Sequence, residues 1–235
     1  MNKKRGFGHV EAILTFVIFV GFLIFAFVFF SPFESGRTLK STLDYAWREV
    51  ADVTEKQLEV YSVAITDSLA SQLVAIAISG TPAGWNAAVE NSSGNPISSY
   101  TDLSGNVNFD RGINNFFVRI KFAEDFAAGN TISGTQLSQN QYNISSSEVA
   151  KVRFENLFNK LKTDYNADYI ALNKQFNLPS RVNFGFSVRF NDGYEIRASR
   201  EIPENAEVLS QSDRVEIVRM PSGKREYAEV NVFVW

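Results

Sequence analysis

The sequence is most constrained by an uncharged apolar stretch close to its beginning. The 19 residues from Ala12 to Phe30 contain no charged side chain, and Thr15 is the only conventional polar residue among them. At about 1.5 Å of rise per residue, a helix of this length spans roughly 28 Å, which is close to the hydrocarbon thickness of a bilayer. A lone segment in lipid satisfies its own backbone polar groups as a helix, so the stretch is predicted to be a transmembrane helix.

The residues on either side of the stretch predict its orientation. The basic run Lys3–Arg5 precedes it, and the positive-inside rule places that end in the cytoplasm. Everything after Pro32 is then expected to be extracytoplasmic, and Pro32 with Gly36 indicates a break between the helix and the segment that follows.

The apolar stretch is also compatible with a buried core helix or a cleaved secretory signal. A buried core helix is usually shorter and keeps a polar stripe. A cleaved secretory signal has an apolar region of about 7–15 residues followed by a small-x-small site. Phe and Val dominate the residues just before Ser31, and no such site occurs there. We therefore expect the segment to remain attached to the protein.

Glu11 lies beside the apolar stretch and is the only acidic residue among the first 33. An acid at the edge of hydrocarbon is costly, although a helix N-terminus favours a negative charge by a few tenths of a kcal/mol. The whole string, Lys3–Arg5 followed by Gly6, Phe7, Glu11 and an apolar helix, resembles the class III signal of type IV pilins. The absence of cysteine and the presence of Gly8-His9 are more similar to archaeal type IV pilin-like proteins than to bacterial major pilins.

The resemblance implies how such a chain is processed and assembled. A prepilin peptidase would cut on the cytoplasmic side between Gly6 and Phe7, and the apolar helix would stay on the mature subunit. Glu11 would then pair with the α-amino group of Phe7, in the same or a neighbouring subunit. Four residues along a helix is roughly 6 Å, which is compatible with that pairing.

The remainder of the chain is predicted to form an α+β head domain. The spacing of apolar residues predicts an amphipathic helix over Arg37–Lys56, and the Ser145/Glu148 capping box predicts a second, long helix over Ser146–Gln175. Strands are predicted at Leu58–Ile65, Ser68–Ile78, Val107–Phe109 and Phe116–Phe122, with a surface loop at Ala127–Asn143. Two antiparallel hairpins are predicted at Val182–Arg200 and Arg214–Val234, with the final residues held in a sheet.

The predicted fold class is therefore α+β: an N-terminal membrane or filament-core helix, followed by an external head with a long helix and an antiparallel sheet. The predicted divisions are a cytoplasmic leader peptide at residues 1–6, a hydrophobic transmembrane and assembly helix at 7–36, and an extracytoplasmic head at 37–235.

Little in the head predicts catalysis. The chain has no cysteine and a single histidine, His9, which excludes thiolate metal sites, multi-histidine sites and most histidine-dependent catalysis. Asp164 and Asp168 lie one helical turn apart and could ligate a cation, although a solvated helix face is the simpler explanation for them. Glu124-Asp125 and Asn191-Asp192 could supply calcium oxygens, but turns favour the same residues for backbone reasons. We expect a non-enzymatic protein without metal or cofactor.

Two sequons and the net charge bear on modification and partners. Asn91-Ser92-Ser93 and Asn143-Ile144-Ser145 match the N-glycosylation triplet. Removing residues 1–6 lowers the 23 Lys and Arg by three to 20, against 26 acidic residues, a side-chain net charge of −6. An acidic head disfavours generic nucleic-acid binding, so no nucleic-acid partner is expected.

These observations predict a type IV pilin-like structural subunit, major or minor, of a cell-surface filament. Its expected partners are membrane lipid, prepilin peptidase and other pilin-like subunits. The alternative is a single-pass protein whose extracytoplasmic part binds a ligand or partner and does not polymerise. Both place the N-terminus in the cytoplasm and the head outside the cell.

Overall fold

The computed structural model describes residues 7–30, 33–66, 71–113 and 115–235, except for the side chains of residues 7–9, 27–30 and 33–37. The helices are α1 (Phe7–Phe30), α2 (Phe33–Thr54), α3 (Glu155–Ala167) and α4 (Tyr169–Gln175). The strands are β1 (Glu55–Ile65), β2 (Leu73–Ala77), β3 (Asn86–Asn91), β4 (Pro96–Ile97), β5 (Ser99–Thr101), β6 (Asn106–Asp110), β7 (Phe117–Ala123), β8 (Thr135–Gln136), β9 (Tyr142–Phe154), β10 (Phe184–Arg189), β11 (Glu195–Ala198), β12 (Leu209–Val218) and β13 (Arg225–Val234).

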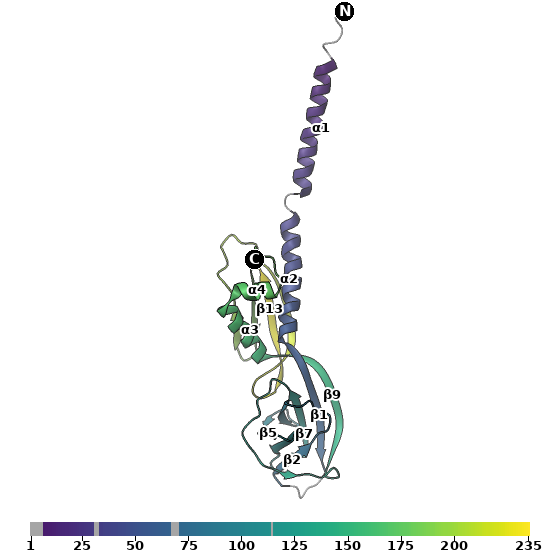
Figure 1. Ribbon diagram of the computed structural model, residues 1–235, viewed down its shortest axis with the longest axis vertical. Helices are drawn as coiled ribbons and strands as arrows, with labels where there is room; N and C mark the ends of the chain where they lie inside the picture. The colour runs from purple at the N-terminus through teal and green to yellow at the C-terminus, as the bar shows by residue number, and fades with distance from the viewer. Residues whose placement is uncertain (1–6, 31–32, 67–70, 114) are drawn as a thin grey trace, which may run out of the picture.

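The molecule is elongated, with α1 projecting from one end of the head (Figure 1). α2 follows α1 almost in line, and β1 continues from α2 toward the opposite end of the molecule. We call the part built from α2, α3, α4 and β10–β13 the proximal lobe, because it lies beside α1. The distal lobe comprises β2–β8 with the far halves of β1 and β9 (Figure 1).

A nine-stranded sheet passes through both lobes in the order β11-β10-β13-β12-β9-β1-β7-β3-β4. Most neighbours in it are antiparallel, and β12 meets β9 in parallel over only Ile217–Val218 and Arg153–Phe154. A second sheet of four strands, β5-β6-β2-β8, belongs to the distal lobe alone. The β1–β9 pairing, which runs along the whole of β1, is the backbone connection between the lobes.

The core of the proximal lobe forms where α2 lies against the C-terminal strands and α3. The spacing of three and four places Leu43, Ala46 and Val50 on one face of α2, and all three are buried. They share a core with the buried rings of Phe158 on α3 and Phe186 on β10, whose centroids lie 6.3 Å apart. Burial of this stripe explains why α2 forms a stable helix at this position.

The core of the distal lobe lies between its two sheets. Alternate residues of β7, including Val118, Ile120 and Phe122, are buried, as expected when one face of a strand packs against a core. Phe109 on β6 and Val74 on β2 belong to the same apolar cluster. The distal lobe is therefore a two-layered β structure with its own core.

A buried ion pair lies where the two lobes meet. The Lys121 Nζ is 2.6 Å from the Glu90 Oε2, and it also donates to the backbone oxygen of Gly223 at 2.9 Å. Lys121 and Glu90 come from the distal lobe, whereas Gly223 lies in the turn between β12 and β13. Burial lowers the pKa of the Lys121 ammonium, and the adjacent Glu90 carboxylate partly offsets that effect.

The glycine in this turn allows the lobes to approach closely. Gly223 has a φ of +67°, a conformation that costs glycine little. A Cβ built at Gly223 would lie 2.6 Å from the Ala88 Cβ on β3. The β12–β13 turn is therefore fitted to the distal lobe by its backbone as well as by the Lys121 contact.

The structure corrects the predicted fold class. Thirteen strands and four helices occur among the described residues, so the molecule is mostly β rather than a head built around a long helix. The helix predicted over Ser146–Gln175 is wrong in its first third, where residues 142–154 form β9. Ser145 and Glu148 do not cap a helix, and the Ser145 hydroxyl instead donates to the Ser62 backbone oxygen of β1 at 3.1 Å.

The physical reason is that pairing between distant segments outweighs a four-residue motif. Residues 142–153 find hydrogen-bonded partners along β1, which a local capping box does not predict. The helical part that remains divides at Asp168, whose carboxylate accepts a hydrogen bond from the Ala171 amide at 2.9 Å and begins α4.

The predicted membrane placement is also corrected. Only the side chains of residues 10–26 are described in α1. Among the described residues, no helix has both the length and the apolar character needed to cross a membrane. This contradicts the expected single-pass arrangement with a cytoplasmic N-terminus and an extracytoplasmic head.

Other local predictions are confirmed. α2 covers nearly all of Arg37–Lys56, but it begins at Phe33 and so contains Gly36, which was expected to lie in a break. The two C-terminal hairpins form as β10–β11 and β12–β13. The final residue is held as expected, because Trp235 is buried and exchanges two backbone hydrogen bonds with Asn183, at 3.0 and 2.9 Å. The loop predicted at Ala127–Asn143 is largely irregular, apart from the short β8 and the beginning of β9.

We expect Lys121→Met to lower the free energy of unfolding by about 3–5 kcal/mol, because it leaves the Glu90 carboxylate buried without its nearest cation. Lys56→Met is the matched control, since Lys56 pairs with Glu124 at 2.8 Å on an exposed surface. We expect that control to cost less than about 1 kcal/mol. Equilibrium urea unfolding measures both values, and equal losses would contradict a special role for the buried pair.

Candidate assembly site

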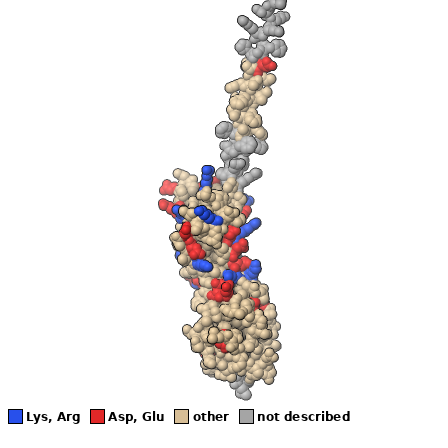
Figure 2. Space-filling model, in the orientation of Figure 1, with Lys and Arg blue, Asp and Glu red and all other residues tan. Residues whose placement is uncertain are grey.

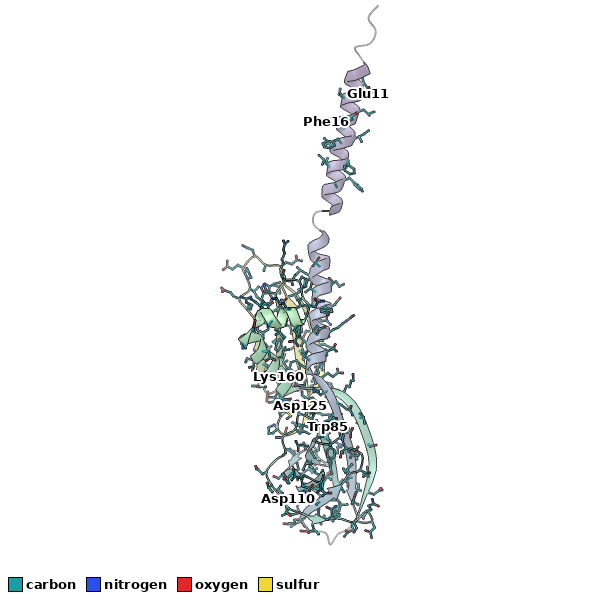
Figure 3. The ribbon with its side chains drawn as sticks, in the orientation of Figure 1. Glu11, Phe16, Trp85, Asp110, Asp125 and Lys160 are labelled. Atoms are coloured by element: carbon teal, nitrogen blue, oxygen red, sulfur yellow. The ribbon has the colours of Figure 1, made fainter. Side chains whose placement is uncertain are left out.

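α1 exposes apolar side chains on all of its sides. Successive residues of a helix point about 100° apart, so Phe16, Val17, Ile18 and Phe19 face four different directions. Their exposed fractions are 66%, 60%, 63% and 57%. Figure 3 shows side chains projecting from α1 well away from both lobes, with Phe16 among them. No side of this part of α1 is covered by the head.

Such a surface is unusual for a helix of a monomeric protein. A helix that is apolar all round is ordinarily buried, because each exposed apolar Å² costs about 25 cal/mol relative to burial. The large exposed apolar side chains of α1 are Val10, Ile13, Leu14, Phe16, Val17, Ile18, Phe19, Phe22, Leu23, Ile24 and Phe25. A contiguous apolar surface of this kind indicates an interaction site.

Glu11 is the one charged residue among the described side chains of α1. Its side chain is exposed, and its backbone oxygen accepts a hydrogen bond from the Thr15 hydroxyl at 2.8 Å. Figure 3 places Glu11 near the free end of α1, away from the head. Any partner that buries this end of the helix must also supply a group that compensates the carboxylate.

The predicted leader cleavage falls at the limit of the described chain. Phe7 is the first residue of α1, whereas Gly6 lies outside the described residues, as does the side chain of Phe7. Cleavage between Gly6 and Phe7 therefore stays a prediction, and so does the pairing of Glu11 with the Phe7 amine.

The two sequon asparagines differ in their surroundings. Asn91 is half-buried at the end of β3, and its Oδ1 accepts hydrogen bonds from the Ser93 and Asn95 amides, each at 3.0 Å. Asn143 is exposed near the beginning of β9. The structure thus gives Asn91 a role in its turn, and glycosylation of either residue stays a prediction.

Three of the acidic residues weighed as cation ligands make other contacts. Asp168 caps α4 through its bond to the Ala171 amide. Glu124 pairs with Lys56, and Asp125 accepts from the Asn156 side-chain amide at 3.1 Å. Among the described residues, no group of three or more His, Cys, Asp or Glu side chains is arranged to hold a metal ion.

Asn191-Asp192 belongs to a turn beside an ionic cluster that the sequence did not reveal. The Asp192 carboxylate accepts from the Tyr194 amide at 2.9 Å, and this bond with the nearby Arg219 lowers the pKa of Asp192. Arg219 also lies 3.0 Å from Glu155 and 2.6 Å from Glu226, with its guanidinium over the Phe190 ring. These contacts attach the beginning of α3 to the β12–β13 hairpin.

No known protein family, curated protein or solved structure matches this chain.

We expect Asp168→Ala to lower the free energy of unfolding by about 1 kcal/mol, because α4 loses the acceptor for its first amides. Asp164→Ala is the control, and we expect a change below about 0.5 kcal/mol for this exposed residue. Thermal unfolding with and without calcium measures both effects. A calcium-dependent stabilisation of the wild type that either variant abolishes would show that these aspartates bind a cation instead.

Proposed function

We propose that the protein is a type IV pilin-like structural subunit that assembles into a filament through α1. The observation that carries this proposal is the exposure of apolar side chains on every side of α1. The head supplies no cover for these side chains, so the cover comes from outside the chain. Other copies of the same helix offer a surface of the same chemistry, which makes α1 complementary to itself.

The all-round exposure favours an assembly of many copies over a dimer. In a two-helix contact each helix covers one side of its partner, and the apolar residues on the other sides stay in water. Because Phe16, Val17, Ile18 and Phe19 all need cover, each α1 requires several neighbours. Repetition of one such contact along an axis, without closing into a ring, builds a filament.

Glu11 fits this arrangement as the group that fixes the relative position of the helices. A carboxylate among packed apolar helices is stable only beside a cation, because burial of an unpaired charge costs several kcal/mol. The resemblance to type IV pilins supplies that cation as the α-amino group of Phe7, which exists only after cleavage at Gly6. Under this proposal a prepilin peptidase therefore makes the subunit competent for assembly.

We expect native protein to begin at Phe7, and Edman sequencing or the intact mass of isolated filaments measures this directly. A mass that retains residues 1–6 in assembled material would contradict the processing step. Gly6→Leu is the corresponding variant, and we expect it to retain the leader and to stay out of filaments.

We expect Phe16→Glu and Ile18→Glu each to abolish filament formation, because each places an uncompensated carboxylate on a different side of α1. Thr163→Glu, on an exposed position of α3, is the control and should assemble normally. Sedimentation followed by negative-stain electron microscopy measures the fraction assembled. Normal assembly of either α1 variant would show that the side it occupies is not packed.

We expect Glu11→Gln to raise the protein concentration needed for assembly by at least about tenfold, because the amine of a neighbour loses its counter-charge. Glu204→Gln, in an exposed loop of the head, removes the same charge away from α1 and should leave that concentration unchanged. Equal behaviour of the two variants would contradict the pairing role of Glu11.

A further inference from the structure

The distal lobe carries a large hollow that the assembly function does not use. Its cavity volume is about 1280 Å³, somewhat above the roughly 300–1,000 Å³ of common small-molecule pockets. Three loops contribute to its walls: residues 78–85 between β2 and β3, residues 102–105 between β5 and β6, and residues 137–139 before β9. The hollow therefore has room for a ligand larger than a common small molecule, such as a short oligomer.

The lining is almost free of charge. Among the residues that line the hollow, Asp102 is the only one with an ionisable acidic or basic group of the Asp, Glu, Lys, Arg or His type. Part of this neutrality is visible in the sequence, because the chain from Phe126 to Ser147, which supplies one wall, contains no charged residue. Figure 2 shows the same character on its visible face, where the distal lobe is nearly all tan while the proximal lobe is dotted with blue and red.

The Asp102 carboxylate already accepts hydrogen bonds from residues of its own turn. The Asp102 Oδ1 accepts from the Ser104 and Asn106 amides, each at 2.9 Å, and its Oδ2 accepts from the Asn106 side chain at 3.0 Å. Burial alone would raise the pKa of Asp102, but these hydrogen bonds lower it, so the group stays ionised and satisfied. Asp102 therefore stabilises the turn at the wall of the hollow, and its carboxylate has little remaining capacity to bind a cation.

Aromatic side chains line the hollow and are held in place. Trp85 and Tyr142 are half-buried and pack against the core of the distal lobe, and Tyr100 is half-buried on the short strand β5. The Tyr142 hydroxyl donates to the Ala77 backbone oxygen at 2.8 Å, which fixes its ring. Figure 3 shows Trp85 in the distal lobe, between the far end near Asp110 and the junction near Asp125.

Amide side chains supply the polar part of the lining. Gln136, Gln139 and Asn143 are exposed and line the hollow. An amide group both donates and accepts hydrogen bonds, so it matches a hydroxyl group, which does the same. The antigen-binding loops of antibodies are enriched in Tyr, Ser, Gly and Asn, because these residues combine rigid contact area with adaptable hydrogen bonding.

We propose that this hollow binds a neutral oligosaccharide. The flat C–H faces of a sugar ring pack on exposed aromatic rings, and its hydroxyls pair with side-chain amides without the desolvation of a charge. An acidic or basic ligand would find no compensating ion pair among the lining residues. The walls are held by backbone turns and by the Asp102 network, so little order has to be acquired on binding.

Binding in the hollow does not depend on filament assembly, because α1 and the distal lobe, whose residues line the hollow, lie at opposite ends of the molecule (Figure 1). The test uses the full chain and a panel of immobilised neutral oligosaccharides: maltotriose, cellotriose, lactose and N,N′-diacetylchitobiose. Sialyllactose and chitosan oligomers are the charged comparisons, and an uncharged Gly/Ser/Asn peptide represents a different class of ligand. We expect saturable binding of at least one neutral sugar.

We expect Trp85→Ala and Tyr100→Ala each to weaken the binding of that sugar at least about tenfold. Tyr227→Ala is the matched control, since Tyr227 is an exposed tyrosine on β13 in the proximal lobe, and its binding should equal that of the wild type. Circular dichroism and thermal unfolding establish that each variant is folded.

A second measurement needs no variant. In the nuclear magnetic resonance spectrum of the wild type, the sugar should shift the indole N–H signal of Trp85 and leave that of Trp235, which is buried at the other end of the head, unchanged. The proposal is overturned if no neutral sugar binds, if the charged sugars or the peptide bind better, or if the Trp85 signal does not move.

Discussion

The pairing of β1 with β9 is the interaction on which the rest of the structure depends. β1 begins where α2 ends, and β9 ends where α3 begins, so one ladder connects the helices of the proximal lobe to the strands of the distal lobe. β7 extends the same sheet on the other side of β1 and brings Lys121 to the junction. A buried apolar cluster that includes Leu58 of β1 and Val152 of β9 lies along this ladder and contains residues of both lobes.

The junction holds a charge pair in addition to a buried apolar cluster, which includes Ala88 and Phe126 of the distal lobe and Leu157 and Val218 of the proximal lobe. Lys121 reaches from β7 to the β12–β13 turn, and Gly223 lets that turn approach β3 within the space that a side chain would fill. A buried pair of this kind is costly to break from one side, so it fixes one arrangement of the lobes.

Local signals predicted part of this fold. The hairpin at Asn191-Asp192-Gly193 was predicted because its turn residues and flanking alternation lie within a few positions of one another. The stripe of Leu43, Ala46 and Val50 predicted α2 for the same reason. Such features depend on residues that are close together in the sequence, so they can be predicted from one sequence alone.

Features that depend on distant segments were missed. β9 resembled a helix start because Ser145 and Glu148 match a capping box, whereas its partner strand is more than eighty residues away. No local sequence pattern predicts the contact between Lys121 and Gly223, which are 102 positions apart. The hollow had one visible signal, the uncharged run Phe126–Ser147, but its aromatic residues come from three separate segments.

α1 differs from the other helices, because its described apolar side chains are not buried against the rest of the protein. Every other helix buries part of its surface in the proximal lobe, whereas the described side chains of α1 stay exposed, apart from the partial cover of Val20 and Ala26. This asymmetry is the physical basis for the proposal that α1 is the part of the molecule that assembles. It also explains why average composition is uninformative, with a mean hydropathy of −0.12 for the whole chain.

The most direct measurement is a cysteine-accessibility scan of α1 in assembled, membrane-free particles, which the absence of native cysteine makes simple. Single cysteines at Phe16, Val17, Ile18 and Phe19 face four directions, and Thr163→Cys on α3 is the exposed control. If several copies surround each α1, a water-soluble maleimide will modify the control rapidly and all four α1 positions slowly. Rapid modification at any of the four positions would contradict the account that neighbouring copies cover α1 on every side.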